Sequence, residues 1–170
     1  MDKHPENSGS NCSESLLMSF GAIKRTAADA WFSKCVRLRA RYRCEVCDTE
    51  YTNGTKDKPS IQYARSDQGL HCSHHFGRRH KATRTEPLNC ISACFGCHRK
   101  LEANPLYHVR FFQNLLGIDI YEIISEKHRL LIPKTQYNEN EQSKHFKTEF
   151  FRQLEESELH DGRLEFRGYI

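Results

Sequence analysis

No run of apolar residues in this 170-residue chain approaches the roughly 18 to 20 residues that a membrane-spanning helix needs. Residues 1–22 are polar and lack a long apolar segment, so we expect neither a signal peptide nor a membrane anchor there. The sequence is therefore interpreted as that of a cytoplasmic protein with no membrane partner. In a reducing compartment its eight cysteines should be thiols, and paired cysteines should hold metal rather than form disulfides.

Apolar residues are also scarce in the chain as a whole. Only 37% of the residues are hydrophobic, whereas 28% are charged, so the hydrophobic core must be modest. The length suits one compact domain with extensions, and not two full domains. Because small domains with thin cores usually depend on metal ions or disulfides, the composition favours a metal-stabilised fold.

Acidic residues are few in the middle of the sequence. Residues 24–100 contain 16 Lys or Arg against 7 Asp or Glu, a net charge of +9, whereas the whole chain carries only +4. A basic middle with more acidic ends predicts a polyanion site, although an unevenly charged solvated surface is the alternative. One predicted helix carries more cationic side chains near its C-terminal end than would be needed to balance the helix dipole, and we expect them to contact phosphates. They are Lys34, Arg37, Arg39, Arg41 and Arg43.

Two CxxC pairs are the strongest signal in the sequence. Cys44 and Cys47 follow the basic helix, and Cys94 and Cys97 open a later helix. Zn²⁺ favours four soft ligands in a tetrahedron, and two such pairs supply them in a closed, structural site. Four buried thiols are the alternative, but polar residues follow each pair. We therefore predict one structural zinc ion, which would also compensate for the small core.

The remaining cysteines lack this spacing. Cys35 lies on the apolar face of a predicted helix and is expected in the core. Cys72 and Cys90 are possible metal ligands by residue type, but neither belongs to a CxxC pair. His71 should lie on the opposite strand face from Cys72, where we expect a structural role. Cys12 falls in the polar N-terminal segment.

Hydrophobic periodicity and turn signals predict an α+β fold. A first helix should begin after Thr26 as its N-cap. The stretch "GLHCSHHF" predicts a strand and "CISACFGCHRKLEA" contains the start of a short helix. The other expected features are a turn at 52–54, a short strand at 61–64, a loop at 77–89 and helices within 104–117, 119–131 and 140–157. The expected organisation is a flexible tail (1–22), a core with a leading basic helix (23–104) and a helical C-terminal extension (105–170).

The stretch "HCSHHFGRRH" at residues 71–80 contains four of the ten histidines of the chain. His74, Asn89 and His98 follow one another in this region, with the last two in the pattern N-x4-C-x2-C-H. This order resembles the HNH, or ββα-metal, nuclease motif, in which a strand ends in the first His and a helix begins with the last. The resemblance implies a small zinc-stabilised ββα-metal core and a metal-dependent DNA endonuclease.

A narrower resemblance covers roughly residues 27–105. The stretches "ADAWFSKCVRLRARYRCEVC", "CSHHFGRRHKATR" and "NCISACFGCHRKLEANP" are similar to the phage lambda NinG/Rap family of recombination nucleases. This implies a phage or prophage protein that acts in the bacterial host and cuts branched DNA such as Holliday junctions or D-loops. The sequence departs from the pattern at two positions. Ser73 replaces the acidic metal ligand of many HNH enzymes, and His75 replaces an aromatic residue.

The resemblance also implies roles for the motif residues. His74 would be the general base, and Asn89 would orient it through the side-chain carbonyl. His98 would bind one Mg²⁺ or Mn²⁺ that stabilises charge on the phosphate. The second ligand stays open among His75, Ser73 acting through water, and His80, and His75 is also the alternative base. The residues expected to bind nucleic acid are Arg37, Arg39, Arg41, Arg78, Arg79, His80 and Arg84.

Two other functions fit parts of the pattern. One is an HNH nickase or duplex endonuclease without junction specificity. The other is a zinc-stabilised DNA-binding module without catalysis, for which the His-Asn-His order would have no purpose. A homodimer would suit junction cleavage, and the segment carrying Phe146, Phe150, Phe151 and Leu154 is a possible dimer element. The alternative is that this face packs within one chain on Trp31, Phe32 and the segment 106–116.

Overall fold

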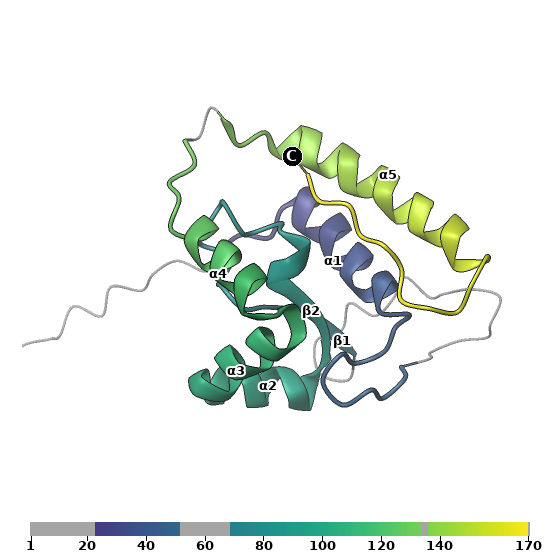
Figure 1. Cartoon of the computed structure of the whole chain (residues 1–170). Helices are drawn as coiled ribbons and strands as arrows, with labels where there is room; N and C mark the ends of the chain where they lie inside the picture. Colours follow the sequence, from purple (N-terminus) through teal and green to yellow (C-terminus); the bar gives the residue numbers. More distant parts are fainter. Residues whose placement is uncertain (1–22, 52–68, 134–135, 170) are drawn as a thin grey trace, which may run out of the picture.

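The structure is a computed structural model that describes residues 23–51, 69–133 and 136–169. The expected N-terminal tail, the turn at 52–54 and the strand at 61–64 lie outside these residues. The described part has an α+β fold with a two-stranded antiparallel sheet (Figure 1). Its elements are α1 (Ala27–Arg39), β1 (Leu70–His74), the 3₁₀ turn η1 (Pro87–Asn89), β2 (Cys90–Cys94), α2 (Phe95–Ala103), α3 (Pro105–Leu116), α4 (Ile118–Lys127) and α5 (Glu139–Ser157).

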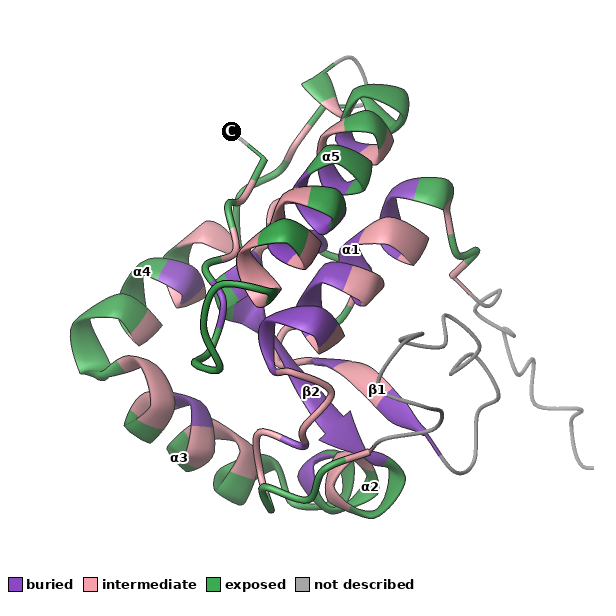
Figure 2. Ribbon diagram, turned by 90° about the vertical axis from the view of Figure 1, so that its right-hand side faces the viewer, coloured by how far each residue is buried: buried purple, intermediate pink, exposed green. Residues whose placement is uncertain are grey.

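The sheet and α2 form a ββα unit. In the register of the hairpin, Leu70 faces Cys94 and His74 faces Cys90. β2 runs directly into α2, and the Cys94 side chain caps this helix by accepting the Cys97 N–H. All five residues of β2 are buried (Figure 2), which explains why its sequence does not alternate between polar and apolar residues.

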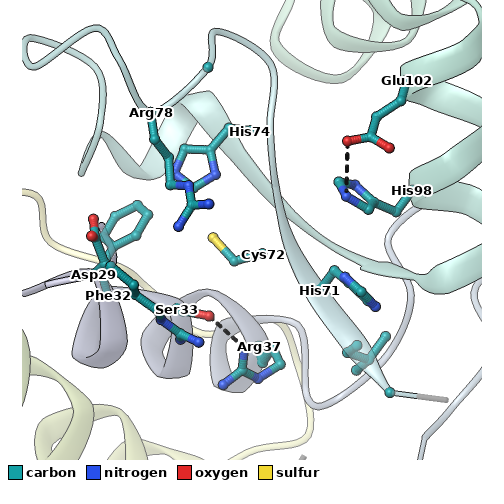
Figure 3. Close-up of a pocket in the computed structure, with 14 residues that line it drawn as sticks. Asp29, Phe32, Ser33, Arg37, His71, Cys72, His74, Arg78, His98 and Glu102 are labelled. Carbon is teal, nitrogen blue, oxygen red and sulfur yellow. Dashed lines mark hydrogen bonds and ion pairs between the residues drawn. The ribbon is translucent and has the colours of Figure 1, made fainter. Parts of the chain in front are cut away.

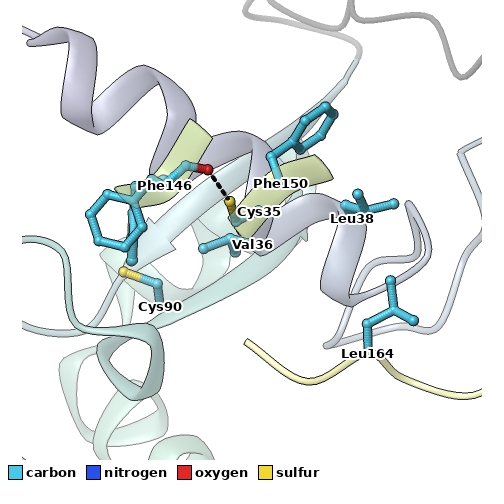
Figure 4. Packing of buried hydrophobic residues seen from close by; sticks show 8 residues of the cluster. Cys35, Val36, Leu38, Cys90, Phe146, Phe150 and Leu164 are labelled. Carbon is cyan, nitrogen blue, oxygen red and sulfur yellow. Dashed lines mark hydrogen bonds between the residues drawn. The ribbon is translucent and has the colours of Figure 1, made fainter. Parts of the chain in front are cut away.

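α1 begins as the sequence predicts. Thr26 and Asp29 form a reciprocal capping box, in which each side chain accepts the other residue's backbone N–H. The apolar face of α1 packs against α5, where the Cys35 thiol donates to the Phe146 carbonyl (Figure 4). Leu164, in the segment that follows α5, is also buried in this cluster.

The aromatic face of α5 is thus used inside the chain, against Trp31 and Phe32. Phe146 and Phe150 are buried there, and the ring of Trp31 contacts that of Phe150. Phe151 is 48% exposed beside Trp31. The structure therefore confirms that this face packs on Trp31 and Phe32 of the same chain. The segment 106–116, which was the other expected partner, lies in α3 and contributes no residue to this buried cluster.

A second buried cluster lies on the side of α2 and α3. Ile91, Leu101 and Phe112 are fully or almost fully buried in it. α3 ends at Gly117, whose φ of +80° favours glycine, and α4 begins immediately afterwards. Among the described residues, no helix has both the length and the apolar character needed to cross a membrane.

Candidate active site and metal centre

The four paired cysteines converge between the end of α1 and the start of α2. Their sulfur atoms lie within 4.8 Å of one another, and the Cys47 and Cys94 sulfurs are 3.9 Å apart. The Cys94 N–H donates to the Cys44 sulfur at 3.3 Å, and the Cys97 N–H to the Cys94 sulfur at 3.5 Å. Backbone donors of this kind stabilise thiolates and orient them as ligands. The cluster is compatible with the predicted structural zinc site.

Ionisation of the cluster also fits a bound cation. Hydrogen bonds from the side chain and backbone of Thr49 lower the pKa of Cys47 to about 6, whereas burial raises the pKa of Cys97. Crowded thiols cannot all lose their protons without a positive charge among them. A divalent metal supplies that charge, so the donor set and its spacing suit Zn²⁺.

A second region of interest is a pocket of about 400 Å³ between α1, β1 and α2 (Figure 3). His74 and His98, two of the three predicted catalytic residues, both line it. Successive side chains of β1 point to opposite faces of the sheet. His74 faces α1, where the centre of its ring lies 6.2 Å from that of Phe32. Ser73 faces α2, where its hydroxyl contacts His98. The two histidines thus reach one pocket from opposite faces of β1.

His74 is held in one tautomer by the backbone. Its Nε2 lies 3.0 Å from the carbonyl oxygen of Arg84, which can only accept, so Nε2 donates and the lone pair of the neutral ring is on Nδ1. The prediction that the Asn89 carbonyl would orient His74 is wrong. Asn89 is fully buried, accepts the Phe76 N–H at 2.8 Å and donates to the carbonyls of Phe76 and Thr83, both at 2.9 Å. Asn89 therefore pins the loop between the strands.

His98 lies in a polar group that the sequence predicts only in part. Its Nδ1 is 3.0 Å from the Ser73 hydroxyl, its Nε2 is 3.3 Å from a Glu102 carboxylate oxygen, and its ring stacks on His71. Burial lowers the pKa of His98, which favours the neutral form that binds metal. His71 and Glu102 were missed as pocket residues. Their spacing could have revealed both, because His71 is two residues from Ser73 on a strand and Glu102 four residues from His98 on a helix.

Two other histidines do not complete a metal shell with His98. The His75 ring stacks on Phe112, its Nε2 bonds to the Tyr121 hydroxyl at 3.0 Å, and burial lowers its pKa to about 4. His80 is exposed, and its ring contacts His128. Neither residue lines the pocket with His98, so the structure gives no support to His75 as ligand or base or to His80 as ligand.

Three arginines expected to bind phosphate are instead used inside the protein. Arg84 is buried, and its guanidinium bonds to both Asp29 oxygens, at 2.8 and 2.5 Å. Arg39 is also buried and donates to two backbone carbonyls and a glutamate. The Arg41 guanidinium donates to three carbonyls within 157–162. Because these guanidinium groups are already bonded to atoms of the protein, the structure does not support the expectation that Arg39, Arg41 and Arg84 bind phosphate.

Other arginines remain directed towards the pocket. Arg37 and Arg78 line it, as does Arg25, which the sequence did not single out. Arg25 and Arg78 form no hydrogen bond or ion pair with any other residue that the structure describes. Arg79 follows Arg78 in the loop and is exposed. The pocket therefore carries excess positive charge, since Asp29 is already paired with Arg84.

Comparisons with known proteins give no independent assignment. No protein-family model, no curated protein and no solved structure matches the chain. The resemblance to HNH and NinG/Rap nucleases therefore remains a prediction. Function is inferred below from the side chains that the fold brings together.

Proposed function

We propose that the chain is a metal-dependent DNA endonuclease of the HNH type. One observation carries this proposal, namely that an antiparallel hairpin leads directly into a helix and both elements place a histidine at one basic pocket. His74 comes from the end of the first strand and His98 from the first turn of the helix. The cysteine cluster beside them would fix the helix relative to the segment that follows α1.

The pocket can support phosphodiester hydrolysis. His74 Nδ1, whose lone pair is kept free by the Arg84 carbonyl, would take a proton from water as the oxygen attacks phosphorus. The bond to the leaving sugar oxygen then breaks, and that oxygen takes a proton from solvent. Mg²⁺ or Mn²⁺ would stabilise the developing charge, with His98 as a ligand and Glu102 as the acidic ligand that Ser73 does not provide.

Arginines on the rim would hold the DNA strand. Arg37 comes from α1 and Arg78 from the loop after β1, so they approach the pocket from different elements. A guanidinium can bind a phosphate through two parallel hydrogen bonds. Arg78→Ala should weaken DNA binding and reduce the salt dependence by about one counterion. Arg129→Ala, which removes an exposed arginine outside the pocket, is the matched control.

The decisive test separates chemistry from binding. Wild-type protein should cut plasmid DNA with Mg²⁺ or Mn²⁺ and stop with EDTA. His74→Ala should lower the cleavage rate by roughly 100-fold or more, since a general base contributes about that factor, while DNA affinity stays within a few-fold. His160→Ala, at an exposed histidine outside the pocket, should cut normally. Equal cleavage by His74→Ala would overturn the proposal, and binding without cleavage under any metal would favour the non-catalytic DNA-binding module.

The finer proposal, supported by the NinG/Rap resemblance, is that the substrate is branched recombination DNA in a phage-infected cytoplasm. Resolving a four-way junction takes two symmetric cuts, which a two-fold homodimer would supply. Rates on a synthetic junction and on linear duplex of equal length should be compared, with sedimentation of the protein–junction complex. Equal rates and one bound chain would instead favour the nickase or duplex endonuclease.

A further inference from the structure

A second group of metal-type side chains lies on the face of the hairpin that is turned towards α1. Cys72 and His74 share this face because they are two residues apart on β1, and Cys90 joins them as the cross-strand partner of His74. The two sulfur atoms and one ring nitrogen of His74 lie within 4.8 Å of one another. The sulfur atoms of the four paired cysteines also lie within this distance of one another.

The chemistry of this group suits a soft divalent ion. Ligand atoms of a tetrahedral zinc site lie roughly 3.5 to 3.8 Å apart, so a contraction of at most about an ångström would complete the geometry. Two thiolates would neutralise the charge of Zn²⁺, which matters beside the cationic Arg37. Mg²⁺, which prefers oxygen ligands, would not be held by two sulfurs and an imidazole.

The surroundings of the group also resemble those of a metal ligand set. The Arg84 carbonyl receives the Nε2 proton of His74, as the outer partner of a metal-bound histidine does. Ser92 lies directly opposite Cys72, is fully buried, and its hydroxyl has no hydrogen-bond partner among the described residues. That hydroxyl could donate to a thiolate. Cys72 lines the pocket, which gives an ion and a water molecule a path to the site.

We propose that Cys72, His74 and Cys90 form a second metal site, specific for thiophilic divalent ions such as Zn²⁺. With three protein ligands, its fourth position would be taken by water from the pocket. The site differs from the predicted structural centre in having no CxxC spacing and only three ligands, so its zinc should exchange more readily.

Occupancy of this site should inhibit the nuclease, a consequence that rests on the function proposed above. An ion bound to His74 Nδ1 uses the lone pair that would accept a proton from water. Zn²⁺ would thus inhibit and Mg²⁺ support the same enzyme through different side chains. At free zinc ten times the dissociation constant, about one chain in eleven keeps an empty site, so cleavage should fall about tenfold.

Zinc titration of the full-length protein tests binding independently of catalysis. The protein is kept reduced and loaded with its tightly bound zinc, and a chromogenic chelator reports competition for further Zn²⁺. Wild type should take up one additional, weaker equivalent, and Cys72→Ala and His74→Asn should lose it. Cys35→Ala is the matched control, because Cys35 is a buried cysteine that belongs to neither group of metal-type side chains. Absence of the additional zinc in wild type, or its full retention in Cys72→Ala, overturns the proposal.

Cleavage assays in Mg²⁺ with added Zn²⁺ test the inhibitory role, each variant being compared with its own rate without zinc. Wild type and Cys35→Ala should be inhibited about tenfold under the condition above, and Cys72→Ala should not. Equal inhibition of Cys72→Ala, or acceleration that needs Cys72, overturns the inhibitory role. If a Cys72-dependent zinc binds but no metal supports cleavage, the site stands and the proposed nuclease function fails.

Discussion

At the residue scale, Arg84 connects the start of α1 to the orientation of His74. Its guanidinium pairs with Asp29, which also belongs to the capping box of α1, and its carbonyl accepts from His74 Nε2. Burial alone would raise the pKa of Asp29, but the hydrogen bonds from Arg84 and Thr26 and the charge of Arg84 together outweigh it, and the pKa lies below its usual value. Arg84, which the sequence predicts to bind phosphate, therefore orients the His74 ring through its backbone carbonyl.

Breaking this pair should be costly. Asp29→Ala leaves the Arg84 guanidinium buried without its partner, which typically costs about 3–5 kcal/mol of unfolding free energy. Urea unfolding monitored by circular dichroism measures the loss. Asp161→Ala removes an exposed carboxylate and should change little. A loss of less than about 1 kcal/mol in Asp29→Ala, the range of surface pairs, would show that the pair is not buried in solution.

His75 should make stability depend on pH. Its folded pKa is lowered to about 4, first by burial and then by the charges of His108 and His128. In the unfolded chain His75 binds a proton below about pH 6.5, whereas in the folded protein it does so only below about pH 4. The free energy of unfolding therefore falls as the pH falls through this window. The full shift corresponds to roughly 3 kcal/mol.

The measurement compares unfolding free energies at pH 7.5 and pH 5 for wild type and His75→Asn. The variant should be less stable at pH 7.5 but lose less on acidification, because it lacks the group that titrates. Acid effects on the cysteine clusters are common to both proteins and cancel in the comparison. Identical pH dependence in the two proteins would mean that His75 titrates normally in the folded state.

At the element scale, the long-range partner of α5 decides how its aromatic face is used. The i, i+4 spacing of Phe146 and Phe150 predicts an apolar stripe, and the structure confirms that both are buried. Periodicity cannot say whether such a stripe faces another copy or the same chain, because both bury the same area. Here the partner is α1, more than 100 residues away in the sequence, as the bond from Cys35 to Phe146 shows.

Two phenylalanines of α5 provide a matched test of this packing. Phe146→Ala should lower the unfolding free energy by about 3–5 kcal/mol, the usual cost of removing a fully buried ring. Phe151→Ala, on the same helix but 48% exposed, should cost much less. Thermal and urea unfolding at two protein concentrations would measure both effects. Similar losses in the two variants would contradict this packing, and a midpoint that rises with protein concentration in wild type but not in Phe146→Ala would indicate a dimer interface.

Across the molecule, local signals predicted the elements and the grouping of soft ligands, but not the surroundings of polar side chains. The Thr26 cap and the strand ending at His74 depend on neighbours a few residues apart, and the structure confirms them. The two CxxC pairs meet across a separation of 47 residues, but the residue type and spacing of each pair indicate a shared ion. The role of Asn89 depends on the path of the whole loop, and the burial of Arg39 on carbonyls about 50 residues away. Such partners leave no periodic trace in the sequence.

The whole fold should depend on the cysteine cluster. Cys44 and Cys47 follow α1, whereas Cys94 and Cys97 belong to the ββα unit, so an ion shared by all four would tie these two segments together within the second buried cluster, which contains Cys44 and Cys94. Cys94→Ser/Cys97→Ser should therefore lose the tightly bound zinc and much of its stability, because metal binding and folding are coupled in such sites. Elemental analysis after dialysis against a weak chelator, paired with thermal unfolding, measures both quantities. Cys35→Ala should keep its zinc, since Cys35 lies outside the cluster. Folded wild-type protein without zinc, or a double variant that keeps it, would contradict the structural zinc site and leave the rigidity of α2 to its packing alone.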